Sequence, residues 1–137
     1  MMLRSYVNGS WTSPAAGGDP LLDAVTGEQV ATISSAGLDM RAALEYGRAV
    51  GGPALRELTF HQRAAILKSV GLLLREHRPE LYALSARTGA TLPDSKFDVD
   101  GGIGVLASYA SKGRRELPDG MILLDDLEAL REIAAEV

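Results

Sequence analysis

A change in periodicity at Gly37 divides the chain into two kinds of structure. Before it, residues 5–12 read as a short strand with an Asn8-Gly9 turn, residues 13–20 are typical of a loop, and residues 30–35 alternate as in a strand. Asn-Gly favours tight hairpin turns because both residues tolerate positive φ. After Gly37, apolar residues recur every three or four positions, as in helices. We therefore expect an α+β chain in which an N-terminal β-ribbon precedes four or five helices.

The helix beginning after Thr59 has the clearest signal. Thr59 and Gln62, three positions later, match a capping box. In this motif the side chain of each residue accepts a hydrogen bond from the backbone N–H of the other. A preceding helix over 38–50 is expected to stop at Gly51-Gly52-Pro53, because proline cannot donate to a helical ladder. The expected core face of the Thr59 helix consists of Phe60, Ala64, Leu67, Val70, Leu73 and Leu74.

Three further helices are expected towards the C-terminus. Pro79 starts the first and Gly89 ends it. A long helix over 93–115 contains three glycines, each costing about 1 kcal/mol relative to alanine. We expect these glycines to allow close backbone contact with another element; they are Gly101, Gly102 and Gly104. The last helix, over 125–137, has an apolar stripe made by Leu127, Leu130, Ile133, Ala134 and Val137.

Composition excludes several classes of function. The 137 residues suffice for a modest core, with roughly two-thirds of the unfolded surface expected to be buried. A net charge of −4 makes nucleic acid an unsuitable partner, and the cluster Lys112-Arg114-Arg115 is typical of a solvated helix C-terminus. No apolar run approaches membrane-spanning length and no signal core is present, so we expect a cytoplasmic protein without a membrane partner. The chain has no cysteine, which excludes a thiol nucleophile.

One segment matches a relaxed dinucleotide-binding fingerprint. Residues 102–107 read Gly-Ile-Gly-Val-Leu-Ala, but such glycines must follow an apolar strand. The preceding residues 94–100 are acidic and unlike a strand, and Asp98 and Asp100 would repel a pyrophosphate. A packing role is the better interpretation, and no cofactor-binding residue is assigned.

Other candidate residues also favour structural roles. His61 and His77 are sixteen positions apart, too far for a shared metal site, and we expect both on the surface. Aspartates at 94, 98 and 100 lack the later bidentate glutamate of a calcium loop and suit a helix N-terminus. The serines at positions 5, 35, 85 and 111 lack a nucleophile-elbow setting. We therefore assign no catalytic and no metal-binding residue.

The order of these segments resembles the N-terminal region of the aldehyde dehydrogenase superfamily. Residues 6–11, Tyr-Val-Asn-Gly-Ser-Trp, look like its opening strand and turn, and residues 25–33 look like the following Thr-Gly-Glu segment and strand. Asp23-Ala24 replaces the usual Asn-Pro, and Gln62 stands where glutamate is usual. Residues 84–89, Leu-Ser-Ala-Arg-Thr-Gly, resemble the end of the family's next helix.

A narrower resemblance is to the dehydrogenase half of bacterial phenylacetate-degradation ring-opening proteins. It covers about residues 3–120 and includes Asp100-Gly101-Gly102-Ile103-Gly104, Tyr109-Ala110-Ser111 and the run 115–119. The resemblance implies a parent enzyme that oxidises a CoA-linked semialdehyde with NAD(P). In that family, the nucleophilic cysteine, the water-activating glutamate and the glycine-rich cofactor turn come later than residue 137. It therefore implies a partial cofactor domain without its Rossmann sheet, truncated and inactive alone.

Two interpretations follow for the whole chain. In the first, residues 1–120 form an aldehyde-dehydrogenase-like segment and residues 121–137 an atypical helical tail, with the remainder of a dehydrogenase or another copy as partner. In the second, the chain is a stand-alone helical oligomerisation or protein-interaction module. Exposed stripes such as Phe60, Leu67 and Leu74 would drive association. In this second interpretation the tail helix could cover these stripes within the same molecule. A calcium-binding role for residues 94–100 is a third, weaker alternative.

Overall fold

Two antiparallel strand pairs form the N-terminal part of the computed structural model, which describes residues 1–123. β1 (Ser5–Val7) pairs with β2 (Ser10–Thr12) across Asn8 and Gly9, whose φ angles of 52° and 77° suit a tight hairpin turn. β3 (Asp19–Leu22) pairs with β4 (Gln29–Ile33). The α+β prediction is confirmed, although the ribbon consists of two separate sheets. β3 also begins inside the stretch 13–20, which was expected to be a loop. The prediction missed this strand because the residues that pair with it, in β4, lie further along the sequence.

A single helical stretch follows, composed of α1 (Met40–Tyr46), the π-helical turn η1 (Gly47–Gly51) and α2 (Gly52–Arg56). The expected stop at Gly51-Gly52-Pro53 is therefore wrong. The Gly52 N–H donates to the Gly47 carbonyl, five residues back, so the helix widens at this point. Pro53 then lies in the first turn of α2 and continues the helical stretch.

The other helices agree closely with the sequence predictions. α3 (Phe60–Glu76) begins at the Thr59 capping box, α4 (Arg78–Ala86) carries Pro79 in its first turn, and α5 spans Leu92–Arg115. Gly89, after α4, has a φ of 87°, a conformation that favours glycine. The expected helix over 125–137 lies outside the described residues.

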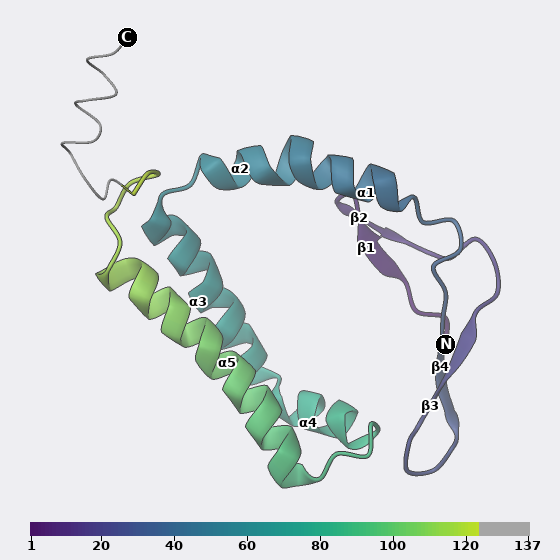
Figure 1. The fold of residues 1–137 in the computed structure, drawn as a ribbon. Coiled ribbons are helices and arrows are strands. Elements are labelled where there is room, and N and C mark those ends of the chain that lie inside the picture. The colour runs from purple at the N-terminus through teal and green to yellow at the C-terminus, as the bar shows by residue number, and fades with distance from the viewer. Residues whose placement is uncertain (124–137) are drawn as a thin grey trace, which may run out of the picture.

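α3 and α5 lie side by side and form the main helical contact (Figure 1). A Cβ built on Gly113 would lie 3.2 Å from the Ala64 Cβ, and one on Gly71 would lie 3.6 Å from the Leu106 Cβ. By contrast, Cβ atoms built on Gly101, Gly102 and Gly104 would meet nothing within 4 Å. The prediction that these three glycines allow close packing is therefore wrong for the described residues. Gly71 and Gly113 have that role instead.

The described residues bury very little apolar side chain. Their buried hydrophobic residues are Ala31, Ala64 and Ala110. The accessible surface of the chain is 10405 Å², whereas a compact protein of this mass would expose about 6,900 Å² and its unfolded chain about 21,000 Å². Folding therefore removes roughly half of the unfolded surface from water, and the expected two-thirds is wrong. The helices that the sequence pattern predicts between residues 38 and 115 are present, but within residues 1–123 the core that would cover their apolar faces is not formed.

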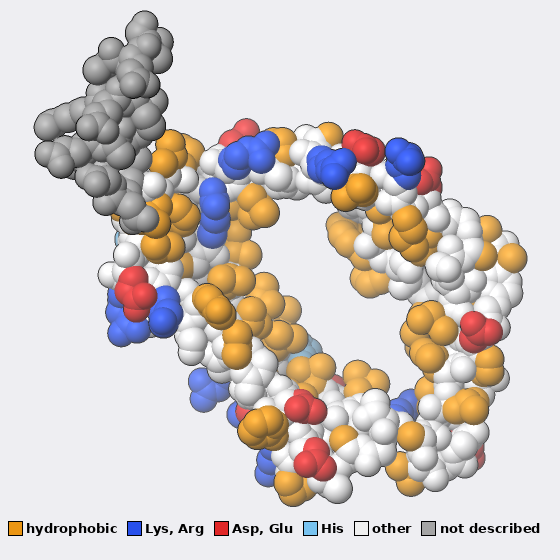
Figure 2. Space-filling view, viewed as in Figure 1, with side chains coloured by type: hydrophobic (Ala, Val, Ile, Leu, Met, Phe, Trp, Pro, Cys, Tyr) orange, Lys and Arg blue, Asp and Glu red, His pale blue; other side chains and the backbone are white. Residues whose placement is uncertain are grey.

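The elements are arranged as an open ring (Figure 1). The α1–η1–α2 stretch forms one side, the α3–α5 pair a second, and the strand pairs a third. The Ala24 N–H donates to the Arg87 carbonyl at 2.8 Å, which joins the β3–β4 turn to the end of α4. Figure 2 shows hydrophobic side chains facing the central opening from several of these elements. Among residues 1–123, no helix is long and apolar enough to cross a membrane.

Candidate functional site

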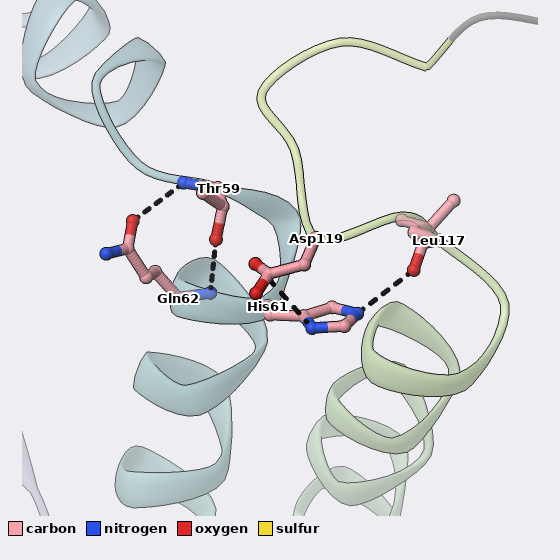
Figure 3. A network of polar contacts seen from close by, with 5 residues as sticks. All are labelled: Thr59, His61, Gln62, Leu117 and Asp119. Carbon is pink, nitrogen blue, oxygen red and sulfur yellow. Dashed lines mark hydrogen bonds and ion pairs between the residues drawn. The ribbon is translucent and has the colours of Figure 1, made fainter.

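The N-terminus of α3 is fixed by reciprocal hydrogen bonds (Figure 3). The Gln62 N–H donates to Thr59 Oγ1 at 3.2 Å, and the Thr59 N–H donates to Gln62 Oε1 at 2.8 Å. This arrangement is a complete capping box and confirms the sequence prediction. It satisfies two N–H groups that the helix itself leaves without partners.

His61 connects this capped end of α3 to the segment after α5. Its Nε2 lies 3.0 Å from the Leu117 carbonyl oxygen, and its Nδ1 lies 3.6 Å from Asp119 Oδ1 (Figure 3). A carbonyl only accepts, so Nε2 carries a proton in this arrangement. The His61 side chain is 27% exposed, so it lies partly at the surface and partly between the two segments that it contacts. Its contacts join two chain segments and include no nucleophile.

A second polar cluster joins α4 to α5. The Tyr82 hydroxyl donates to Asp100 Oδ1 at 2.8 Å, and Arg78 Nη1 lies 3.4 Å from the same oxygen. Partial removal of water from Tyr82, together with its hydrogen bond to the Asp100 carboxylate, raises the pKa of the Tyr82 hydroxyl above its usual value. Both effects favour the neutral phenol, so this cluster stabilises a hydrogen-bond donor and not a base.

The aspartates considered for a cation site contact different parts of the structure. Asp94 accepts a hydrogen bond from the Thr91 hydroxyl at the start of α5, whereas Asp100 contacts Tyr82 and Arg78. Within residues 1–123, no cluster of three or more histidine, aspartate or glutamate side chains could hold a metal ion. Asp94 therefore caps α5, and Asp100 links α5 to α4.

The dinucleotide-like glycines lie in the middle of α5, as residues 102–107 are wholly helical. In a phosphate-binding turn the glycine N–H groups point at the ligand, but N–H groups inside a helix donate to carbonyls of the same helix. Residues 102–107 therefore do not fit the pyrophosphate of NAD(P).

The remaining candidates also take structural roles. His77 ends α3, exposed and 3.5 Å from Glu80, while His61 lies in the first turn of the same helix. Ser85 accepts a hydrogen bond from Ser95 at 2.9 Å. As predicted, the cluster Lys112-Arg114-Arg115 lies in the last turn of α5.

An apolar groove of about 320 Å³ lies between the start of α3 and the end of α5, and sequence reasoning did not identify it. Phe60, Ala64 and Leu67 line one side, and Tyr109 and Leu117 the other. We call it the α3–α5 groove. Charged residues at its rim are Arg63, Lys112 and Glu116. A signal was present in Gly113, whose small size brings α5 close to Ala64, but periodicity alone does not pair one helix with another.

Residues 11–130 match the sequence model of the aldehyde dehydrogenase family. The chain belongs to the aldehyde dehydrogenase family. It is also 45% identical, over 115 residues, to a 3,4-dehydroadipyl-CoA semialdehyde dehydrogenase of Aromatoleum evansii. The aligned region covers 83% of this chain and 22% of that relative, so the chain spans about a fifth of the relative's length. The resemblance described from the sequence is thereby confirmed, whereas the division at residue 120 stays a prediction.

Proposed function

We propose that this chain is a structural segment of an NAD(P)-dependent, cytoplasmic aldehyde dehydrogenase that oxidises a CoA-linked semialdehyde, and that it has no dehydrogenase activity by itself. Membership of the family supports the general activity of the parent enzyme. The activity of the Aromatoleum relative, a CoA-linked semialdehyde dehydrogenase, supports the substrate class.

The observation that carries the structural role is the large uncovered apolar surface. Several helices follow an amphipathic pattern, yet the described part of the chain buries only alanines among its apolar residues. Leu55, Val70 and Leu73 are 53%, 41% and 55% exposed. Contiguous exposed apolar side chains mark interaction surfaces. The proposed occupant of the central opening is the remainder of a dehydrogenase, whose sheet would cover the inner faces of these helices.

The lack of independent activity rests on chemistry. Family catalysis requires a cysteine nucleophile, and this sequence has none. The glycines resembling a cofactor turn are helical, so they offer no free N–H groups to a pyrophosphate.

An assay of the purified chain with NAD⁺ or NADP⁺ and a CoA-linked semialdehyde tests this proposal. We expect no NAD(P)H above a mock purification and no calorimetric binding of either nucleotide at millimolar concentration. Steady NAD(P)H formation that co-purifies with the chain would contradict the proposal. The Aromatoleum dehydrogenase serves as the positive control for substrate quality.

The second candidate function is a stand-alone oligomerisation or protein-interaction module. The same exposed apolar surface favours it, since identical copies can cover one another. Light scattering during gel filtration separates the two functions. A closed oligomer of one defined size over a wide concentration range favours the module. A monomer that becomes ordered only with the rest of a dehydrogenase favours the structural segment.

A further inference from the structure

The α3–α5 groove has the form of a docking site for a short apolar helix. Its walls, formed by Phe60 and Leu67 on α3 and by Tyr109 on α5, are almost entirely carbon. The Gly113–Ala64 approach brings the two helices together along the groove floor. Tyr109 is 64% exposed, so its ring offers a large contact area that the described residues leave uncovered.

The chain leaves the described region at one end of this groove. The Phe60 N–H donates to the Gly120 carbonyl at 2.8 Å, and His61 contacts the Leu117 carbonyl and Asp119. These bonds hold residues 117–120 against the first turn of α3, and Phe60 and Leu117 themselves line the groove. Residue 124 is only four positions beyond Gly120, so the connection spans at most about 14 Å.

Residues 124–137 have a matching length and apolar pattern. As a helix, these residues would extend about 21 Å, which exceeds the roughly 10 Å between Phe60 and Leu67 along α3. Their apolar residues recur at helical spacing, as Leu127, Leu130, Ile133, Ala134 and Val137.

Charge on the two surfaces is also complementary. Residues 124–137 contain five acidic residues and a single cation, Arg131. The groove carries two cations, Arg63 and Lys112, and one acidic residue, Glu116, at its rim. Arg114 and Arg115 belong to the same last turn of α5, so cations predominate at this end of the groove. An acidic amphipathic helix suits this site better than a basic one because opposite charges flank its apolar contact.

We propose that residues 124–137 of this chain dock, as an amphipathic helix, into the α3–α5 groove of the same molecule. The apolar stripe lies against Phe60, Leu67 and Tyr109, and the acidic residues face Arg63 and Lys112. This inference does not depend on the proposed dehydrogenase role, because it concerns only how the 137-residue chain covers part of its own surface.

Trypsin provides the test, since Arg131 is the one tryptic site in residues 124–137. The readout is release of residues 132–137, followed by mass spectrometry. We expect release from the chain to be at least about tenfold slower than from a synthetic peptide of residues 121–137, because cleavage follows the undocked population. Equal rates in the chain and the peptide would overturn the proposal.

A charge reversal with a matched control locates the contact. Lys112→Glu should raise the release rate roughly two- to fivefold, as expected for a partly exposed ion pair. Lys96→Glu makes the same charge change near the other end of α5, outside the groove, and should leave the rate unchanged. Leu127→Asp with Leu130→Asp should abolish protection. Equal effects of the two lysine variants would overturn the assignment to this groove.

A second measurement covers the case in which Lys112→Glu unfolds the chain. Because the sequence has no cysteine, Glu136→Cys gives a single site for a nitroxide label. We expect the label to broaden the amide NMR signals of Ala64 and Gly113 and to leave that of Gly101 unchanged. No broadening would overturn the proposal. Broadening that requires mixing labelled with unlabelled copies would also overturn it, since the occupant would then be another molecule's segment.

Discussion

Ser95 donates a hydrogen bond of 2.9 Å from its hydroxyl to the hydroxyl of Ser85, and Ser95 is 1% exposed. The most buried side chain of the described region is therefore polar, and it joins the first turn of α5 to α4. Buried hydroxyls are stable only with a partner, so this pair fixes how α4 and α5 are positioned relative to each other.

Replacing Ser95 by alanine should weaken the α4–α5 contact. We expect the free energy of unfolding to fall by about 0.5–1.5 kcal/mol, because one hydrogen bond is lost while the packing volume is nearly kept. Urea unfolding followed by circular dichroism measures the change. Ser69→Ala is the matched control, since the Ser69 hydroxyl is exposed and bonds only within α3. An equal loss in both variants would contradict a special role for Ser95.

Thr59→Ala should destabilise α3 through its N-cap. The expected loss is about 1 kcal/mol, the usual value for a threonine cap, because the Gln62 N–H loses its acceptor. Thermal unfolding monitored at a helical wavelength provides the measurement. Thr59→Ser retains the hydroxyl and should remain close to the parent chain. If serine and alanine were equally destabilising, the hydroxyl would not be the cause.

The glycines of α5 should respond to alanine in different ways. Gly104→Ala should stabilise the isolated chain by up to about 1 kcal/mol, because a helical glycine is replaced where nothing lies within 4 Å. Gly113→Ala should gain clearly less, or destabilise, since the added methyl lies 3.2 Å from Ala64 Cβ. Parallel urea titrations compare the two variants. A larger gain at Gly113 than at Gly104 would contradict the α3–α5 packing.

The Tyr82–Asp100 pair should make stability depend on pH in the alkaline range. A raised pKa in the folded state means that the folded chain holds the phenol proton more tightly than the unfolded chain. The stabilisation is complete below the unfolded tyrosine pKa near 10 and is lost as pH rises through the folded value. Ultraviolet titration of the four tyrosines, compared with Tyr82→Phe, isolates this step.

Asp100→Asn is the control for that titration. It removes the negative charge and the charged acceptor, so the pKa of Tyr82 should move back towards its usual value. The alkaline loss of stability should shrink in the same variant. An unchanged Tyr82 titration in Asp100→Asn would show that partial burial alone raises the pKa.

Features set by a few neighbouring residues could be predicted from the sequence. The capping box at Thr59 and Gln62 and the glycine stop at Gly89 each depend on residues within one turn. Family membership could also be predicted, because several short motifs of the aldehyde dehydrogenase family occur in the same order along this chain. The absence of a thiol nucleophile followed from composition alone.

Features that depend on distant partners could not be predicted in this way. β3 exists because Asp19–Leu22 meets β4, and Pro20 had suggested a loop. The widened turn before Pro53 required backbone geometry that a proline stop signal does not encode. His61 lies beside Leu117, which is distant in the sequence, so its half-buried position had no local signal. The α3–α5 groove was missed for the same reason, since it needs two helices in register.

Complementation of a dehydrogenase tests the central claim most directly. The Aromatoleum relative would be prepared without its region aligned to this chain, and NAD(P)H formation from a CoA-linked semialdehyde would be measured with and without added chain. We predict no activity from either part alone and restored activity when both are refolded together, because the added chain covers the exposed apolar faces of its partner. Full activity of the shortened relative without the chain, or activity of the chain alone, would contradict the account.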